Sequence, residues 1–252
     1  MIYVMSDIHG NSRRFNSIME QINLQPEDTL YILGDVIDRY PDGIRILRRL
    51  MAMPNTKMLL GNHEYMMLRV LDRPYDPNEK LTGFERAEAT RLWYRNGGKV
   101  THEYWKHIQK DIREEIIKYL HTVPVNIDIT VNDIHYTLVH AAPAENYERH
   151  PIRQYNSATE YAVWERWDGR NYRNGNSIFI FGHTQTLYFQ RKNPMEVWYG
   201  NRRIGIDCGC GLPESAAAIY GIVGRLACLR LDDMKVFYSH EPSFNNVIQQ
   251  QG

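Results

Sequence analysis

The chain has 252 residues, of which 43% are hydrophobic and 24% are charged, as is ordinary for a soluble globular protein with a sizeable core. Lysine plus arginine and aspartate plus glutamate both number 30, so the overall charge favours neither a nucleic-acid partner nor a membrane surface. We find no secretory leader and no apolar run of about 18 residues, and the odd cysteine count favours a reducing compartment, so we expect a cytoplasmic protein.

The first third of the chain alternates between apolar strands and amphipathic helices. Ile2–Met5, Thr29–Leu33 and Lys57–Leu60 are short apolar runs, typical of buried strands. Between them, apolar residues recur at helical spacing from about Ser12 to Asn23 and again from Ile44 to Met51. This β-α-β-α-β order predicts parallel strands joined by right-handed crossovers.

The middle of the chain, from about residue 72 to residue 121, is rich in charged and aromatic residues and is predicted to be mostly helical. We expect a helical insertion or cap beside the sheet, and a longer layer of the same core is the alternative. Strands return as Val125–Val131 and Ile134–Val139, which the turn Asn132-Asp133 joins into a predicted hairpin.

The last third is predicted to add further strands. Ser177–Phe181 is apolar and follows the turn signal Asn174-Gly175, and Gly224–Leu231 with Lys235–Tyr238 is typical of a final hairpin. The sequence therefore predicts one mixed α/β (α+β) domain over residues 1–240, followed by a polar tail at residues 241–252.

Polar side chains follow each of the first three predicted strands. The carboxyl ends of parallel strands lie side by side, and ligand sites form in the crevice beyond them. Two later apolar strands end in histidines, which reach the same crevice if those strands join the same layer. The side chains expected to converge there are Asp7, His9, Asp35, Asn62, His63, His140 and His183.

Two aspartates, three histidines and one asparagine of this set offer mixed oxygen and nitrogen ligands, which suit Mn²⁺, Fe or Zn²⁺ rather than Ca²⁺. Six ligands are too many for one tetrahedral ion and suit two ions that share a carboxylate. Two dications, two carboxylates and a bridging hydroxide leave a charge of about +1, which attracts a phosphate dianion. Each residue taken alone is more often a helix cap or a core histidine, so the joint pattern carries the prediction.

Five motifs occur in a fixed order: Asp-x-His-Gly from Asp7, Gly-Asp-x-x-Asp-Arg from Gly34, Gly-Asn-His-Glu from Gly61, His-Ala at His140 and Gly-His-Thr from Gly182. Together they resemble the phosphoprotein phosphatase family of calcineurin-like metallophosphoesterases. The match is closest to its bacterial and phage-lambda-type serine/threonine protein phosphatases. This resemblance implies a β-sandwich flanked by helices and two divalent metal ions, with Mn²⁺ expected first.

The resemblance also implies how the metal ligands divide. Asp7, His9 and Asp35 would hold one ion, and Asp35 would bridge to the second. The remaining ligands of the second ion would be Asn62, His140 and His183.

The catalytic residues are also implied by the resemblance. His63 would be the general acid that protonates the leaving alkoxide, and Asp38 would hydrogen-bond it. Arg39 would bind the phosphate bidentately, and Arg166 in its Trp-x-Arg pattern would be a second phosphate arginine. The residues expected on the substrate phosphate are Arg39, Arg166, Asn62 and His63.

Some features depart from the family pattern or have simpler interpretations. Tyr40 stands where the family usually has glycine, so it is expected to narrow or line the mouth of the site. Arg166 has a structural alternative, a surface arginine stacked on Trp164 or Trp167. The pair Cys208 and Cys210 is interpreted as two small residues in a tight turn rather than a metal or redox pair.

Other residues near the motifs are predicted to carry no chemistry. Glu64 follows His63, but no H-E-x-x-H motif exists, which argues against a zinc protease. Asp207 and the aromatic residues around Trp93 and Trp105 are interpreted as structural.

The first hypothesis for function is a metal-dependent phosphomonoester hydrolase, specifically a serine/threonine protein phosphatase. A hydroxide bridging the two ions would attack phosphorus in line. The alternative enzyme is a diadenosine-tetraphosphate or nucleotide pyrophosphohydrolase on the same fold. Enzymes of that branch typically lack the aspartate before the motif arginine, so Asp38 argues against it. The third possibility is a catalytically silent binding module. Such a module should have lost at least one metal-ligating residue, and none is missing.

Overall fold

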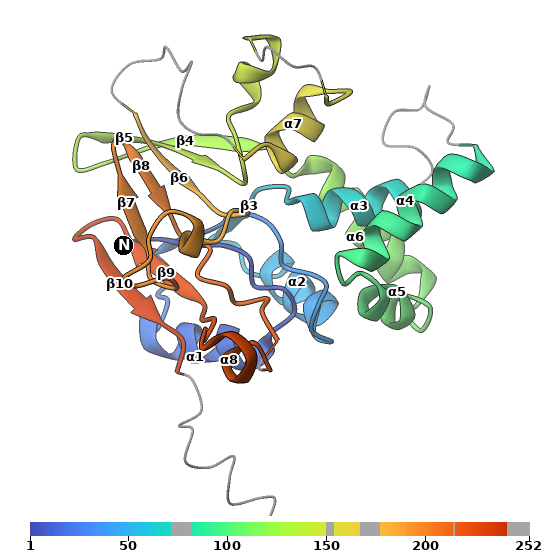
Figure 1. Ribbon diagram of the computed structural model, residues 1–252, viewed down its shortest axis with the longest axis horizontal. Helices are drawn as coiled ribbons and strands as arrows, with labels where there is room; N and C mark the ends of the chain where they lie inside the picture. Colours follow the sequence, from blue (N-terminus) through green and yellow to red (C-terminus); the bar gives the residue numbers. More distant parts are fainter. Residues whose placement is uncertain (72–81, 150–153, 167–176, 214, 241–252) are drawn as a thin grey trace, which may run out of the picture.

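The computed structural model describes residues 1–71, 82–149, 154–166, 177–213 and 215–240. The expectations for residues 72–81, Trp167, the turn Asn174-Gly175 and the tail 241–252 lie outside these ranges. Within them, the chain forms two five-stranded sheets flanked by helices (Figure 1). The predicted β-sandwich with outer helices is therefore confirmed.

The first sheet has the strand order β10-β9-β1-β2-β3. Its centre is parallel and consists of β1 (Ile2–Met5), β2 (Thr29–Ile32) and β3 (Thr56–Met58), which confirms the predicted β-α-β-α-β unit. The predicted final hairpin is formed by β9 (Ala227–Arg230) and β10 (Lys235–Tyr238), and β9 pairs antiparallel with β1.

Helices α1 (Ser12–Ile22) and α2 (Gly43–Met51) connect the parallel strands. Helix α1 ends at Asn23, whose left-handed backbone stops the helix one residue after its last apolar position. Asp42 directly precedes α2. Its Oδ2 accepts a hydrogen bond from Ser12 Oγ at 2.6 Å, so it ties the starts of the two helices together instead of capping its own helix.

The second sheet has the order β4-β5-β6-β8-β7. The predicted hairpin is β4 (Asn126–Val131) and β5 (Ile134–Val139), paired antiparallel. Strand β6 (Ile178–Phe181) pairs in parallel with β5, so the strands that precede His140 and His183 are neighbours in one sheet. The sheet is completed by two short strands that the sequence did not predict, β7 (Trp198–Gly200) and β8 (Arg203–Gly205).

Side chains of the central strands alternate between two hydrophobic layers. On β1, Val4 packs between the sheets with Leu138 and Ile180, whereas Tyr3 and Met5 pack under the helices. These five side chains are at most 3% exposed, and burial of each large apolar side chain stabilises the fold by roughly 1.5–3 kcal/mol. Close packing of these strands therefore holds the residues at their carboxyl ends in fixed positions.

The middle of the chain is helical, as predicted. Figure 1 shows its helices gathered on one side of the two sheets. Their apolar side chains, Trp93 and Ile116 among them, belong to the same hydrophobic cluster as α1 and α2, so they do not form a core of their own. The helices of this predicted segment are α4 (Gly83–Arg95), α5 (Lys99–Trp105) and α6 (Lys110–Thr122). Helix α3 (Asn62–Leu71) lies before the segment and was not predicted.

Shorter helical segments were not predicted. They are the 3₁₀ segments η1 (Ala144–Arg149) and η2 (Thr186–Tyr188) and the helices α7 (Ala158–Trp164) and α8 (Ser215–Tyr220). In the part of the chain that the structure describes, every helix is too short or too polar to cross a bilayer.

Candidate metal centre and active site

Asp35 lies at the centre of the predicted ligand cluster. Its Oδ2 is 3.8 Å from Nε2 of His9, and its Oδ1 is 3.4 Å from Nε2 of His140. Asp35 belongs to two groups of residues that could each hold a metal ion, and within each group the ligand atoms lie within 4.8 Å of one another. One group is Asp35 with His9 and His63, and the other is Asp35 with His140 and His183. The structure thus places Asp35 where one carboxylate can serve two cations.

Asp7 adjoins the same cluster from the end of β1. Its Oδ1 is 3.8 Å from Nε2 of His9, and it accepts hydrogen bonds from Ser6 Oγ and from the backbone N–H of His183. A Cβ atom on Gly182 would lie 2.2 Å from Asp7 Oδ2, so the Gly-His motif needs its glycine to let the end of β6 approach the end of β1. The two sheets therefore meet at this carboxylate.

Asn62 links the two histidines of the second sheet. Its Oδ1 is 3.0 Å from Nε2 of His140 and 2.9 Å from Nδ1 of His183. Nδ1 of His140 donates to the backbone oxygen of Leu33 at 2.6 Å, so its Nε2 carries a lone pair that faces the amide oxygen. Two lone pairs that face each other repel unless a cation lies near both, so this donor set fits a metal ion.

The protonation of the cluster also fits a cation. Burial, followed by the nearby charges of Asp207 and Asp35, raises the pKa of Asp7 well above its ordinary value. Burial lowers the pKa of His140 and that of His183, which favours the neutral rings that metal ligands require. A bound cation would relieve the repulsion among the buried carboxylates.

The backbone around the cluster turns sharply. Left-handed backbone in a residue other than glycine costs on the order of 1 kcal/mol and gathers at functional sites. Backbone hydrogen bonds from His9 N to Asp35 O at 2.9 Å and from Asp7 N to Gly34 O at 3.1 Å hold the turns that follow β1 and β2. The site residues with φ between 51° and 72° are Asp7, His9, Asp35, Asp38, Arg39 and His183.

Glu64 supports the metal-ligand loop, a role that the sequence did not predict. Its side chain is fully buried and accepts hydrogen bonds from the backbone N–H groups of Asp35, Val36 and Ile37 at 2.8–3.2 Å. It also accepts from Gly61 N at 3.2 Å. One carboxylate thus fixes the turn after β2 against the turn after β3. The sequence feature that could have indicated this role is a charged residue directly after His63.

His63 and Asp38 form a close pair beside the ligand cluster. Nδ1 of His63 lies 2.6 Å from Oδ2 of Asp38, and its Nε2 lies 3.4 Å from Nη2 of Arg39. Oδ2 of Asp38 also accepts a hydrogen bond from Trp93 Nε1 at 2.7 Å. The interpretation of Trp93 as merely structural is therefore incomplete, because this side chain contacts the predicted catalytic pair.

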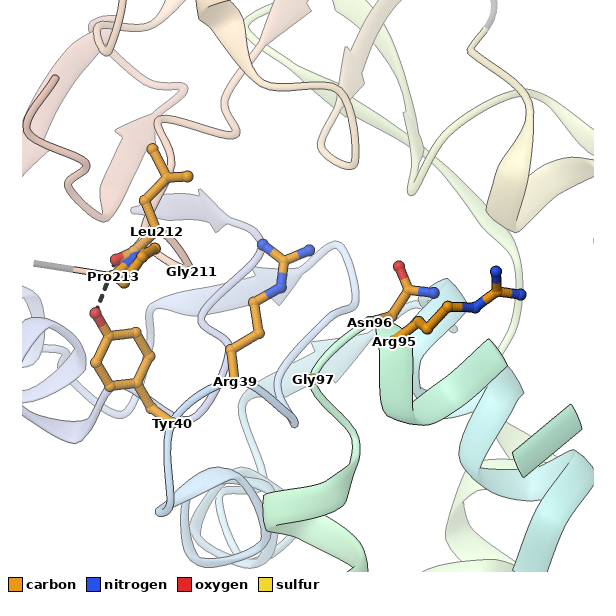
Figure 2. Close-up of a pocket in the computed structure, with 8 residues that line it drawn as sticks. All are labelled: Arg39, Tyr40, Arg95, Asn96, Gly97, Gly211, Leu212 and Pro213. Carbon is orange, nitrogen blue, oxygen red and sulfur yellow. Dashed lines mark hydrogen bonds between the residues drawn. The ribbon is translucent and has the colours of Figure 1, made fainter. Parts of the chain in front are cut away.

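A pocket of about 660 Å³ opens beside Arg39 (Figure 2). Its lining comes from three segments, residues 39–40, 95–97 and 211–213. The hydroxyl of Tyr40 donates to the backbone oxygen of Leu212 at 2.7 Å, as the dashed line in Figure 2 shows. Tyr40, which departs from the family pattern, thus lines the pocket beside Arg39.

Arg166 lies near the other histidines. Its guanidinium carbon is 5.6 Å from the ring centroid of Tyr188, so Tyr188 is a stacking partner that the sequence did not predict, and Trp167 lies outside the described residues. Burial lowers the pKa of His183, and the charge of Arg166 adds to that effect. Burial raises the pKa of Asp207, and the charge of Arg166 opposes that rise. Arg166 is exposed, so it can reach a ligand from the solvent side of the cluster.

Comparison with known proteins decides the family. The family model for calcineurin-like phosphoesterases matches residues 1–208. The chain belongs to the calcineurin-like phosphoesterase family. The family predicted from the five motifs is confirmed, and with it a hydrolase that acts on phosphoesters.

Two kinds of curated relative resemble this phosphoesterase. It is 29% identical to serine/threonine-protein phosphatase 2 of Escherichia coli K12 over 194 residues, which cover 72% of this chain and 78% of the relative. It is 30% identical to the symmetrical bis(5'-nucleosyl)-tetraphosphatase of Proteus mirabilis over 100 residues. That second match covers only 37% of each of the two chains.

Solved structures share the fold. A crystal structure provisionally assigned to a diadenosine tetraphosphatase has a TM-score of 0.56 at 17% identity, with 97% of this phosphoesterase and 94% of that chain covered. A metallophosphoesterase from Sphaerobacter thermophilus has a TM-score of 0.51 at 18% identity, with 99% and 92% covered. At these identities the likeness shows the architecture alone.

Proposed function

We propose that this phosphoesterase is a metal-dependent phosphomonoester hydrolase whose substrates are phosphoserine and phosphothreonine in proteins. The observation that carries the proposal is the pair of His63 and Asp38, 2.6 Å apart, with Arg39 on one side and the ligand cluster around Asp35 on the other. This arrangement provides an acid for the leaving alkoxide next to a site that attracts phosphate.

The ligand cluster fits two divalent ions, and we propose Mn²⁺ first, with Fe and Zn²⁺ as the alternatives. One ion would be held by Asp7, His9 and Asp35, and the second by Asp35 with the ligands from α3 and the second sheet, Asn62, His140 and His183. When bound, the ions would supply an activated water and offset the charge of the phosphoryl oxygens.

His63 is better suited to proton transfer than to metal binding, although its Nε2 lies 3.7 Å from Asp35 Oδ2. Its Nδ1 faces Asp38, and the guanidinium of Arg39 lies 3.4 Å from its Nε2, where a metal ion would meet another positive charge. Burial lowers the pKa of His63 and raises that of Asp38. A phosphate dianion beside the pair would favour the imidazolium, whose Nε2 proton then goes to the leaving oxygen.

The substrate phosphate would be held mainly by two guanidinium groups. Arg39 can offer two parallel N–H donors to the phosphoryl oxygens, which lysine cannot do. Arg166 would approach from the solvent side, near His183. The amide of Asn62 and the ring of His63 would complete the contacts to the phosphate.

The second candidate function is hydrolysis of diadenosine tetraphosphate, which the names of several relatives suggest. Two features favour the protein phosphatase. The match to the E. coli protein phosphatase covers 78% of that relative, whereas the tetraphosphatase match covers 37%. Asp38, which the resemblance associates with protein phosphatases, is present and bonded to His63.

A substrate comparison tests the proposal. Purified enzyme with Mn²⁺ is assayed on phosphoserine, phosphothreonine and phosphotyrosine peptides, on diadenosine tetraphosphate and on a cyclic nucleotide. We expect the highest kcat/KM on the phosphoserine and phosphothreonine peptides. A clear preference for diadenosine tetraphosphate would replace the protein-phosphatase proposal with the second candidate.

We also propose that residues 1–240 form one domain, with the helical segment at about residues 72–121 inserted into it, and that the protein works in the cytoplasm. The described helices of the insertion share the hydrophobic cluster of the sheets. The three cysteines are buried thiols that form no disulfide, which suits a reducing compartment.

A further inference from the structure

The turn between α4 and α5, residues 95–98, packs directly against the catalytic loop. The backbone N–H of Arg39 donates to the backbone oxygen of Gly97 at 3.2 Å. Gly97 has a φ of +97°, and a Cβ atom there would lie 2.9 Å from Cγ of Arg39. Glycine is therefore required at this approach, and the turn has a fixed position beside the phosphate-binding arginine.

This turn supplies one wall of the pocket in Figure 2. Asn96 and Arg95 stand on one side of Arg39, and Tyr40 with Leu212 and Pro213 stands on the other. Two arginines belong to the lining, and the lining residues that the structure describes include no carboxylate. The pocket is thus suited to anionic groups.

The charge of Arg95 is not compensated by an ion pair with any residue that the structure describes. Arg95 is exposed at the end of α4. One turn earlier on the same helix, by contrast, Arg91 pairs with Glu88 at 3.0 Å. Figure 2 shows the Arg95 side chain directed away from Arg39 at the rim of the pocket, where this exposed guanidinium is available to a ligand that extends beyond Asn96.

We propose that this pocket is the leaving-group subsite and that Arg95 selects substrates with a second anionic group on the leaving group. This inference rests on the proposed function, because it takes His63 as the acid. The leaving oxygen must lie at Nε2 of His63, which is 3.4 Å from Nη2 of Arg39, so the rest of the leaving group enters the pocket that Arg39 lines.

The second charge lies several bonds from the scissile phosphorus, because Arg95 lines the wall beyond Asn96 in Figure 2. It can be an acidic side chain next to a phosphoserine or a further phosphate of a polyphosphate chain. Either group would pair with an exposed arginine, so the gain in kcat/KM should be about fivefold, should come mainly from KM and should shrink at high salt.

The test compares four proteins: wild type, Arg95→Gln, Arg95→Lys and the control Arg91→Gln, which removes the same charge from the same helix outside the pocket. The substrates are 4-nitrophenyl phosphate, two phosphoserine peptides that differ by Glu or Gln after the phosphoserine, and diadenosine tetraphosphate. The peptide pair and the dinucleotide distinguish a carboxylate from a phosphate as the second anion.

We expect Arg95→Gln to lower kcat/KM on the Glu peptide or on diadenosine tetraphosphate about fivefold more than on 4-nitrophenyl phosphate. Arg95→Lys should recover part of that loss, and Arg91→Gln should match wild type. An equal effect of Arg95→Gln on every substrate would overturn the subsite. If only diadenosine tetraphosphate responds and the peptides are not hydrolysed, the subsite stands and the protein-phosphatase proposal fails. Failure of the wild-type enzyme to hydrolyse 4-nitrophenyl phosphate would contradict both the subsite and the proposed phosphatase function.

Discussion

The indole Nε1 of Trp93 donates a hydrogen bond to Oδ2 of Asp38 at 2.7 Å, and the same oxygen faces Nδ1 of His63 at 2.6 Å. Trp93 is fully buried in the helical region, 55 residues away in sequence from the loop that it contacts. Its N–H stabilises the carboxylate form of Asp38 and orients it toward the imidazole. The helical region thereby acts on the acid of the proposed reaction.

Replacement of Trp93 with Phe keeps most of the buried ring and removes this donor. Loss of a hydrogen bond to a charged group should lower kcat on a phosphoserine peptide by about tenfold. The loss on 4-nitrophenyl phosphate should be smaller, because its leaving group needs less protonation. Trp105→Phe is the matched control, since Trp105 is a buried ring in the same hydrophobic cluster. Equal losses on both substrates would indicate a purely structural role for Trp93.

Replacement of His63 with Asn tests the acid itself. We expect kcat on a phosphoserine peptide to fall about 10²-fold or more, the usual scale for loss of a general acid. An aryl phosphate with a good leaving group should lose less. The comparison is made by steady-state kinetics with saturating metal, and identical losses on the two substrates would reject the acid role.

Gly211 lies close to two proposed site residues. A Cβ atom at this position would be 2.4 Å from Cδ2 of His9 and 2.6 Å from Nη1 of Arg39. Gly211→Ala should displace both side chains and lower kcat/KM by on the order of 10²-fold, as misplacement by about 1 Å can do. Gly83→Ala is the control, because a Cβ atom at Gly83 would have nothing within 4 Å of it. Full activity of Gly211→Ala would contradict the close packing.

The cysteines should be chemically silent in the native protein. Cys208, Cys210 and Cys228 are buried thiols outside any disulfide, and burial raises the pKa of the Cys208 and Cys228 thiols. A thiol reagent such as Ellman's should therefore label none of the three before unfolding and all three in denaturant. Rapid native labelling of two thiols would instead favour the redox pair considered for Cys208 and Cys210.

Much of the site was predictable because its residues follow apolar strands. Once Ile2–Met5, Thr29–Ile32 and Thr56–Met58 are parallel neighbours, their polar successors must meet at one edge. The later histidines, His140 and His183, follow two strands that pair with each other in the second sheet. Packing of the two sheets, rather than membership of one layer, brings all of these ends together.

Other features were not predictable from pattern. Strands Trp198–Gly200 and Arg203–Gly205 have three residues each, too few for an alternating pattern to be recognised. The contacts of Trp93 and Glu64 depend on tertiary packing, since each joins a helix to a loop on a different part of the chain. A buried hydrogen bond between distant segments produces no regular residue spacing from which it could be predicted.

The central claim is that the carboxylate of Asp35 serves two cations at once. The most direct measurement is calorimetric titration of chelator-treated, metal-free protein with Mn²⁺, for wild type and for Asp35→Asn. We predict two ions bound per wild-type chain, with a rise in Tm as they bind, and at most one weakly held ion in the variant. A single ion in wild type, or two in Asp35→Asn with unchanged affinity, would contradict the shared-carboxylate centre.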